Sequence, residues 1–265
     1  MNNFKLEEKF FHDINKEIRN LINKSLLSNK IAKNKGHSSD YATEIDISVE
    51  KTIVKYIKNN FKDDEILAEE NHSNQLISNK RIWIIDPICG TSNLGRNIKM
   101  YCTNIALAIN KKVVCACVID HSNDNYYWSS GNNKIFINNL ELKKDNKDVG
   151  VKIEVDFGAT LNLSNSEKLK HNKVVGLLST TTNYEIVSYN TSLSLATYIA
   201  IGKIDGSINF FTKPWDIAAG AFLIQQSGGI ITNLHGKPWS LLSPSFIAAK
   251  NKEIHQILLN IYNKA

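Results

Sequence analysis

The chain has 265 residues, enough for one large domain or two small ones with a full hydrophobic core. Its 42% apolar and 22% charged residues are typical of a globular protein. A net charge of +6 favours anionic partners, but the lysines are spread along the chain, which favours a solvated surface over a nucleic-acid-binding stripe. No window of about 18 residues is wholly apolar, and residues 1–9 lack the core of a signal peptide, so we expect no membrane span.

The four cysteines indicate a reducing compartment, which we expect to be the cytoplasm. Cys89, Cys102, Cys115 and Cys117 have neither zinc-finger spacing nor the pattern of a small disulfide-stapled domain. Cys115 and Cys117 alternate along a predicted strand and are expected to pack as small hydrophobic side chains.

The first half of the chain predicts two helices followed by a series of strands. Apolar residues at helical spacing predict helices over residues 10–22 and 45–57. Short β-type runs predict strands over residues 65–68, 81–85, 103–109, 113–119 and 125–129. The polar tip at residues 110–112 indicates a hairpin between two of them.

The second half begins after residues 143–148, which are charged and poor in apolar residues. We therefore predict an N-terminal α+β part over residues 1–145 and a C-terminal α/β part over residues 146–265, together one compact unit. Strands are expected over residues 174–178, 204–211, 230–232 and 246–249. Helices are expected over residues 192–201, 217–226 and 253–263, with Pro214 at the start of the second and Gly228 and Gly229 closing it.

The most informative segment runs over residues 83–93, with the sequence WIIDPICGTSN. An apolar run brings Asp86 to a sharp turn, and a small polar segment that starts a helix follows. A carboxylate at a strand end, with backbone N–H groups and a helix dipole just beyond it, suits a metal ion beside a phosphate.

Three acidic residues lie at the ends of predicted apolar elements: Glu69, Asp86 and Asp216. Each alone is consistent with a helix cap or a solvated side chain, and Asp216 with an ordinary acid in a first helical turn. Together they suit a hard divalent cation, which needs several oxygens from separate elements, and phosphoryl transfer uses such cations. Because they are far apart in sequence, their spacing alone leaves both interpretations open.

Residues 86–93 resemble the D-P-x-D-G-T-x-N signature of the inositol monophosphatase family. Residues 40–46 and 49–51 are similar to its helix segment with a T-x-x-D element, 66–70 to its G-E-E element, and 215–220 (WDIAAG) to its W-D-x-A-A-G element. These elements follow the family order and spacing across nearly the whole chain. The resemblance implies an α/β (α+β) fold, a layered αβαβα sandwich of the sugar-phosphatase type, and a homodimer.

The resemblance also implies roles for individual residues. Metal ligands, for two or more Mg²⁺ ions, would be Glu69, Asp86, the Ile88 carbonyl and Asp216. The catalytic residues that orient the attacking water would be Asp46, Glu69 and Thr91. The phosphate and substrate contacts would be Gly90, Thr91, Ser92, Thr191 and Asn209. Thr91 is equally consistent with a helix N-cap, and one residue can serve both purposes.

Three residues depart from the family pattern. Cys89 replaces an Asp that contacts more than one metal ion, and a thiol is a poor ligand for Mg²⁺. A soft-metal site around the Cys89 thiolate is an alternative, but no second Cys or His has suitable spacing, so we expect weakened metal binding instead. Asn190 replaces a Gly, and Asn209 replaces a Glu that contacts sugar hydroxyls. An amide still bonds a polyol but carries no charge.

We therefore expect a metal-dependent phosphomonoesterase that hydrolyses a small sugar or polyol phosphate such as inositol monophosphate, with activity weakened by Cys89. The alternative is a catalytically impaired family member that acts as a binding or regulatory protein, for example in ribosomal RNA transcription, although no motif supports a nucleic-acid or transcription partner. A third possibility is a related substrate, such as a nucleotide 3′-phosphate or fructose bisphosphate, but no residue or motif in the sequence indicates either one.

Overall fold

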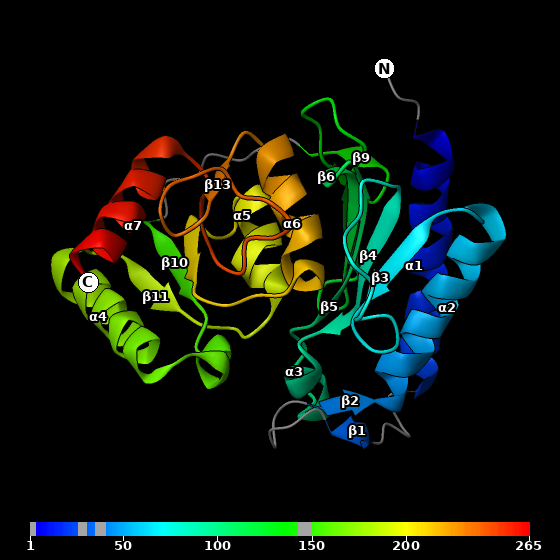
Figure 1. Ribbon diagram of the computed structural model, residues 1–265, viewed down its shortest axis with the longest axis horizontal. Coiled ribbons are helices and arrows are strands. Elements are labelled where there is room, and N and C mark those ends of the chain that lie inside the picture. The colour runs from blue at the N-terminus through cyan, green and yellow to red at the C-terminus, as the bar shows by residue number, and fades with distance from the viewer. Residues whose placement is uncertain (1–3, 26–30, 35–40, 143–149) are drawn as a thin grey trace.

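A computed structural model describes residues 4–25, 31–34, 41–142 and 150–265 of the chain. Helices and sheets alternate in five layers (Figure 1). Helices α1 and α2 cover one sheet, α5 and α6 lie between the two sheets, and α4 and α7 cover the second sheet. The predicted αβαβα sandwich is confirmed. The expected boundary at residues 143–148 lies outside the described residues.

The first sheet contains seven strands in the order β3-β4-β5-β6-β7-β8-β9. Its strands are β3 (Glu65–Ala68), β4 (Ile82–Cys89), β5 (Cys102–Ile109), β6 (Lys112–Asp120), β7 (Asn125–Ser129), β8 (Phe136–Ile137) and β9 (Leu140–Glu141). Strand β3 is parallel to β4, and each later pair is antiparallel. The predicted hairpin joins β5 to β6, and its two loop residues, Asn110 and Lys111, both have positive φ, as a tight hairpin turn requires.

Two amphipathic helices, α1 (Lys5–Ser25) and α2 (Glu44–Asn60), cover the outer face of this sheet. Their apolar residues recur every three or four positions and are buried in one cluster with residues of β4, β5 and β6. Thr43 begins α2 through a capping box with Asp46. Thr43 also ends β2 (Tyr41–Thr43), which pairs with β1 (Ile31–Asn34) in a two-stranded sheet.

The second sheet contains five strands in the order β11-β10-β12-β14-β13. Its strands are β10 (Lys152–Val155), β11 (Glu185–Val187), β12 (Gly206–Asn209), β13 (Ile230–Thr232) and β14 (Phe246–Ala249). The helical elements of this half are η2 (Gly158–Asn162), α4 (Asn165–Thr181), η3 (Leu193–Thr197), α5 (Tyr198–Ala200), α6 (Pro214–Gln226) and α7 (Lys252–Lys264). Strand β10 is parallel to both of its neighbours, so their carboxyl ends lie at one edge of the sheet.

The structure corrects several expectations for this half. Residues 174–178, predicted as a strand, belong to helix α4, which a capping box between Ser164 and Glu167 begins. The apolar run there is compatible with a strand, but the buried residues of α4 (His171, Val174 and Leu178) follow helical spacing. Strands β10 and β11 were not predicted, and β12 is shorter than residues 204–211. The helix expected over residues 192–201 begins with the π-helical turn η3.

Helix α6 forms the middle of the sandwich, and it is buried along eight consecutive residues. It packs in one apolar cluster with strands of the first sheet and with η3 and α5. A helix that is apolar on every side requires such a position between layers. Among the described residues, no helix combines the length and apolar character that crossing a membrane demands. The burial of α6 brings its first turn, which carries Asp216, against the end of β4.

Candidate metal centre

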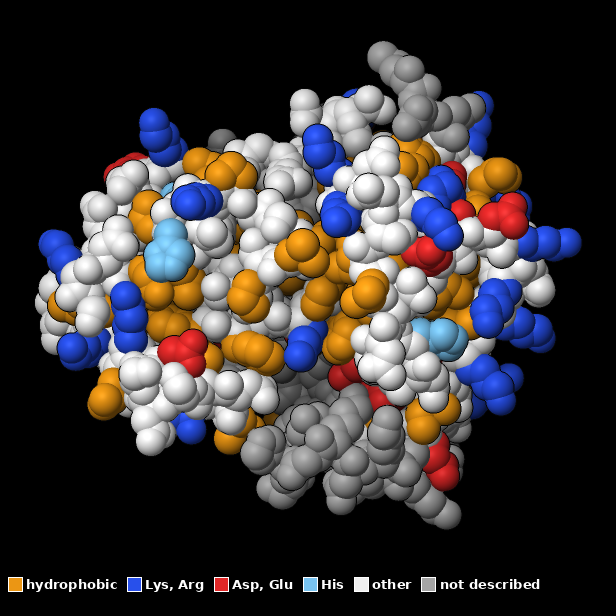
Figure 2. All heavy atoms as spheres, in the orientation of Figure 1, with side chains coloured by type: hydrophobic (Ala, Val, Ile, Leu, Met, Phe, Trp, Pro, Cys, Tyr) orange, Lys and Arg blue, Asp and Glu red, His pale blue; other side chains and the backbone are white. Residues whose placement is uncertain are grey.

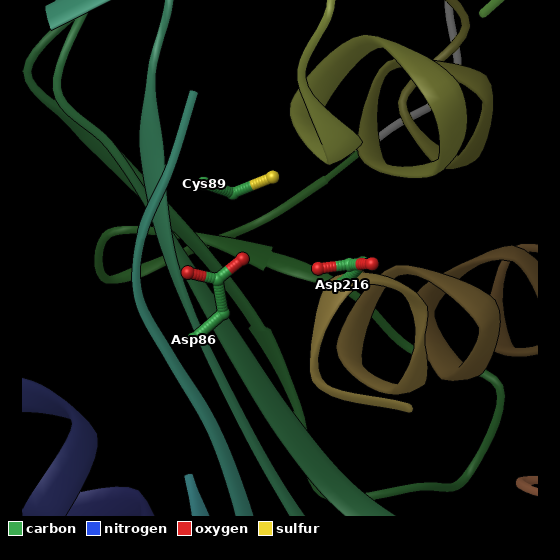
Figure 3. A group of neighbouring side chains, drawn as sticks. All are labelled: Asp86, Cys89 and Asp216. Atoms are coloured by element: carbon green, nitrogen blue, oxygen red, sulfur yellow. The ribbon is translucent and has the colours of Figure 1, made fainter. Parts of the chain in front are cut away.

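Asp86, Cys89 and Asp216 come together where the two halves of the chain meet. Each offers one ligand atom, and the three atoms lie within 4.8 Å of one another. Asp86 and Cys89 come from strand β4, and Asp216 comes from the first turn of helix α6; all three side chains point toward a common centre (Figure 3). The sequence left the convergence of Asp86 and Asp216 open, and the fold provides it.

Local backbone features direct the two β4 side chains toward α6. The pairing of β4 with β5 is irregular between Asp86 and Cys89, so the strand bends there. Gly90 follows with φ of +98°, and a Cβ at this residue would lie 2.9 Å from the Met100 carbonyl oxygen. Only glycine suits this turn, because it tolerates both the positive φ and the close approach of the backbone.

The Asp86 carboxylate is buried, and one of its two oxygens has no hydrogen bond within the described part of the chain to offset the loss of water. Its side chain is 1% exposed, and its Oδ1 atom has no hydrogen-bond partner among the described residues. Burial, followed by the charges of Cys89, Glu69 and Asp216, raises the pKa of Asp86 well above its usual range. A buried carboxylate oxygen without a partner is costly, and a bound cation would satisfy it.

Asp216 is both a helix cap and a member of the group. Its Oδ2 atom accepts a hydrogen bond of 2.8 Å from the Lys213 N–H. Burial nevertheless raises the pKa of Asp216 to about 6, against the lowering effect of the hydrogen bonds from Lys213 and Thr212. The first-turn role considered from the sequence and the place beside Asp86 are therefore compatible.

Glu69 follows β3 and lies beside the group without belonging to the set of three. Its N–H donates to the Ile85 carbonyl at 3.2 Å, which fixes its backbone next to β4. Its carboxylate hydrogen-bonds Asp86 and contributes to the raised pKa of that residue. Glu69 can therefore supply a further oxygen near the same centre.

Thr91 links residues 86–93, which we call the metal loop, to helix α2. Its Oγ1 atom lies 2.7 Å from Asp46 Oδ1 and 2.9 Å from the Ile88 carbonyl oxygen, and its single proton serves one of them at a time. Asp46 is fully buried, and burial raises its pKa despite hydrogen bonds from Thr43 and Thr91. The N-cap of helix α3 (Thr91–Gly95) is Gly90, so the N-cap interpretation of Thr91 is wrong.

Cys89 lies against the start of η3 and against strand β5. Its Sγ atom accepts a hydrogen bond of 3.1 Å from the Ser192 N–H, and Thr191 Oγ1 donates to the Cys89 carbonyl at 3.2 Å. Cys102 is its cross-strand partner on β5. The neighbouring Cys102 thiol and burial raise the pKa of Cys89 well above its usual range. Thr191, expected at the substrate, is 2% exposed and holds the metal loop through this bond.

Asn209 lies at the end of β12, where the amide side chain of Asn209 donates to Asp156 Oδ2 at 3.1 Å. Asp156 follows β10, parallel to β12, and the charge of Asp156 adds to the raised pKa of Asp216. Sequence reasoning missed Asp156 because it did not identify β10. Had β10 been recognised, an acidic residue directly after a strand would have been the signal.

The donor chemistry decides which cation suits this group. The oxygens of Asp86 and Asp216, with Glu69 beside them, suit a hard divalent cation such as Mg²⁺. The Cys89 sulfur does not suit Mg²⁺, because Mg²⁺ prefers oxygen ligands. The oxygen donors therefore fit the magnesium expected from the sequence, and the sulfur does not.

The chain is similar to known proteins in sequence and in fold. The chain is 29% identical over 238 residues to an inositol monophosphatase of Dictyostelium discoideum, covering 84% of this chain and 83% of that protein. It is 32% identical over 200 residues to a Nus factor SuhB of Xylella fastidiosa, covering 74% and 70% of the two chains. A solved IMPase/NADP phosphatase, complexed with Mg²⁺ and phosphate, has the same fold, with a TM-score of 0.84, 22% identity and coverage of 98% and 96%.

The sequence profile of the inositol monophosphatase family matches residues 7–265 of the chain. The match includes both sheets and the three residues Asp86, Cys89 and Asp216. With the layered sandwich and the two carboxylates that meet between its halves, this match shows that the chain belongs to the inositol monophosphatase family.

Proposed function

We propose that the protein is a divalent-metal-dependent phosphomonoesterase that acts on a small sugar or polyol phosphate such as inositol monophosphate. The observation that carries the proposal is the convergence of Asp86, Cys89 and Asp216 within 4.8 Å, together with a buried Asp86 oxygen that has no hydrogen-bond partner among the described residues. The family membership supports the reaction class. A cation held by Asp86, Asp216 and Glu69 would neutralise the phosphate and stabilise the leaving oxygen.

The Asp46–Thr91 pair would orient the attacking water. When Thr91 Oγ1 donates its proton to Asp46 Oδ1, at 2.7 Å, the oxygen lone pairs of Thr91 become free to accept a hydrogen bond from water. Asp46 is itself held by the Thr43 N–H at 2.9 Å, so the start of α2 positions the pair. Glu69, beside Asp86, would accept a second hydrogen bond from the same water.

The metal loop would also contribute donors for the phosphate. The N–H groups of Thr91 and Ser92, in the first turn of α3, have no carbonyl partner within the helix. They lie directly after the two β4 ligands, so a phosphate held by the cation would be within reach of them. The Ile88 carbonyl oxygen has two lone pairs, so it would be able to contact the cation whether Thr91 donates to it or to Asp46.

Asp156 would compensate for Asn209 in the recognition of substrate hydroxyls. The Asn209 amide is 1% exposed and its nitrogen is bound to Asp156, whose carboxylate follows β10 and influences Asp216. A carboxylate accepts hydrogen bonds from adjacent hydroxyls of a polyol, as an amide nitrogen cannot. Asp156→Asn should therefore raise KM for a polyol phosphate more than it lowers kcat.

The experiment that tests this function measures phosphate release from a panel of polyol, sugar and nucleotide phosphates with Mg²⁺, Mn²⁺ or Zn²⁺, and with a chelator. We expect metal-dependent release that is lost in Asp216→Asn. The matched control is Asp63→Asn, which removes an equal charge from an exposed residue and should leave release unchanged. Release that persists in the chelator, or in Asp216→Asn, would contradict the proposal.

A second function is a binding or regulatory role with little catalysis. It is supported by the similarity to the Nus factor SuhB and by the presence of Cys89 beside Asp86 and Asp216. Lys and Arg side chains are scattered over the face drawn in Figure 2 and form no continuous stripe there, so that face gives no support for nucleic-acid binding. Co-purification with transcription factors from cells, together with no phosphate release under any metal, would favour this role.

A homodimer and a cytoplasmic location complete the proposal. The homodimer follows from the resemblance to the family, and the location from four free cysteines, which suit a reducing compartment. Sedimentation equilibrium of the purified chain measures the first. Fractionation of the source cells measures the second.

A further inference from the structure

The ligand set of the metal centre contains a sulfur atom that the proposed function leaves unexplained. Cys89 Sγ is one of the three ligand atoms within 4.8 Å, and it replaces an oxygen at a place where Mg²⁺ would require one. The sequence alone favours weakened Mg²⁺ binding over a change of metal. The structure gives three observations that favour a change.

The first observation is the direction of the three side chains. The Cys89 sulfur, one carboxylate oxygen of Asp86 and one of Asp216 face the same point from two elements (Figure 3). Two carboxylates and one thiolate form a mixed oxygen and sulfur set, and three protein ligands with one open position are typical of catalytic zinc sites. The residues therefore match a thiophilic divalent cation in both number and type.

The second observation is the buried oxygen of Asp86. Within the part of the chain that the structure describes, Oδ1 has no hydrogen-bond partner, although Asp86 is only 1% exposed. One of the two carboxylate oxygens of Asp86 points toward the sulfur and Asp216 (Figure 3). A cation is the group that would satisfy a carboxylate oxygen there, so the site calls for a ligand independently of Cys89.

The third observation is the support behind the sulfur. The N–H of Ser192, the residue directly before η3, donates a hydrogen bond to Cys89 Sγ at 3.1 Å. The same contact fixes the side chain, as outer hydrogen bonds do for metal ligands.

We infer that Asp86, Cys89 and Asp216 bind a thiophilic divalent cation, Zn²⁺ or a similar ion, in preference to Mg²⁺. When the cation binds, the Cys89 S–H bond breaks, the sulfur keeps the electron pair and forms the bond to the metal, and one proton passes to solvent. No oxidation or reduction takes place. The inference rests on the proposed function in one respect only: both place the cation at the same three residues.

The test titrates the full-length protein with Cd²⁺, a spectroscopic probe for thiophilic metals, and follows thiolate-to-metal charge-transfer absorption in the ultraviolet. We expect the absorption to saturate at one equivalent of Cd²⁺. Zn²⁺ should displace the bound Cd²⁺ at a concentration at least about tenfold lower than the concentration of Mg²⁺ needed for the same displacement. No absorption, or displacement by Mg²⁺ and Zn²⁺ at equal concentrations, would overturn the inference.

Two variants assign the sulfur. Cys89→Ser should abolish the absorption and weaken Zn²⁺ binding at least about tenfold, the loss expected for a disturbed metal ligand shell. The matched control is Cys102→Ser, which removes the cross-strand neighbour on β5, a thiol outside the group of three, and should keep the absorption. Absorption that survives in Cys89→Ser and disappears in Cys102→Ser would overturn the assignment.

A measurement without substitution covers the case in which Cys89→Ser does not fold. The intact protein is alkylated with and without Zn²⁺, and each cysteine is read by mass spectrometry. Zn²⁺ should slow alkylation of Cys89 at least about tenfold, because the metal-bound thiolate is not free to attack. An unchanged rate would contradict the inference. Because every readout here is binding, a protein that binds Zn²⁺ without releasing phosphate would overturn the proposed function alone.

Discussion

The substitution Cys89→Asp gives the most informative perturbation of the metal centre. It places a third carboxylate beside those of Asp86 and Asp216, where the ligand atoms lie within 4.8 Å of one another. In the presence of a chelator, no cation offsets the added charge. We therefore expect the variant to be less stable than the wild type in chelator and to recover when Mg²⁺ is added.

The size of the effect follows from the separation. Two unit charges no more than 4.8 Å apart, at an effective dielectric constant of about 20, repel by at least about 3.5 kcal/mol. Proton uptake by the carboxyls limits the penalty, since the pKa values of Asp86 and Asp216 are already raised. The loss of unfolding free energy should therefore be largest above pH 7 and shrink as the pH falls, because protonated carboxyls do not repel.

The assay is urea denaturation at several pH values, in chelator and in saturating Mg²⁺. A matched control, Gln256→Glu, adds one negative charge to an exposed residue of α7 and should change stability little. We expect Mg²⁺ to stabilise Cys89→Asp more than the wild type, and Mg²⁺-dependent phosphate release to rise in the variant. Equal stability of variant and wild type in chelator, with no added response to Mg²⁺, would refute the reasoning.

Three further predictions concern other residues. Burial raises the pKa of Glu154 from 4.5 to about 8, so the folded state favours the neutral form of its carboxyl group. The free energy of unfolding should therefore fall as the pH rises from 4.5 to about 8, by up to about 1.4 kcal/mol per pH unit. Glu154→Gln should remove this slope when denaturation is measured as a function of pH. Gly220→Ala would bring a Cβ to 2.4 Å from the Ala196 Cβ and should cost about 1–3 kcal/mol in urea denaturation, whereas Gly176→Ala meets nothing within 4 Å in helix α4 and should stabilise by about 0.5–1 kcal/mol. Thr91→Val should lower kcat about a hundredfold or more with the fold intact by circular dichroism, and an unchanged kcat would exclude Thr91 from water orientation.

Most of the first half of the fold follows from local sequence patterns. The strands at residues 65–68 and 125–129 match their predicted bounds, because short β-type runs there are ended by turn residues. Residues 174–178 show where such patterns fail: the same apolar run suits a strand or one face of a helix, and only packing against α7 and β-strands decides between them.

The sequence also predicts only part of the candidate site, because the rest depends on tertiary packing. The sequence identifies Asp86 and Asp216 as ends of apolar elements, but their approach depends on which strands α6 packs against, which no local pattern encodes. Cys102 stayed unplaced because the register of β4 with β5 sets it opposite Cys89. Asp156 escaped notice because β10 has only four residues and no strong alternation.

The central claim is that Asp86 and Asp216 hold a divalent cation that supports phosphate release. The most direct measurement is phosphate release from inositol monophosphate by the wild type and by Asp86→Asn, with Mg²⁺, Mn²⁺ and Zn²⁺ supplied in turn after removal of bound metals by a chelator. The account predicts release by the wild type with at least one of these cations and a loss of at least about a hundredfold in Asp86→Asn. Release that needs no cation, or that Asp86→Asn leaves unchanged, would contradict it.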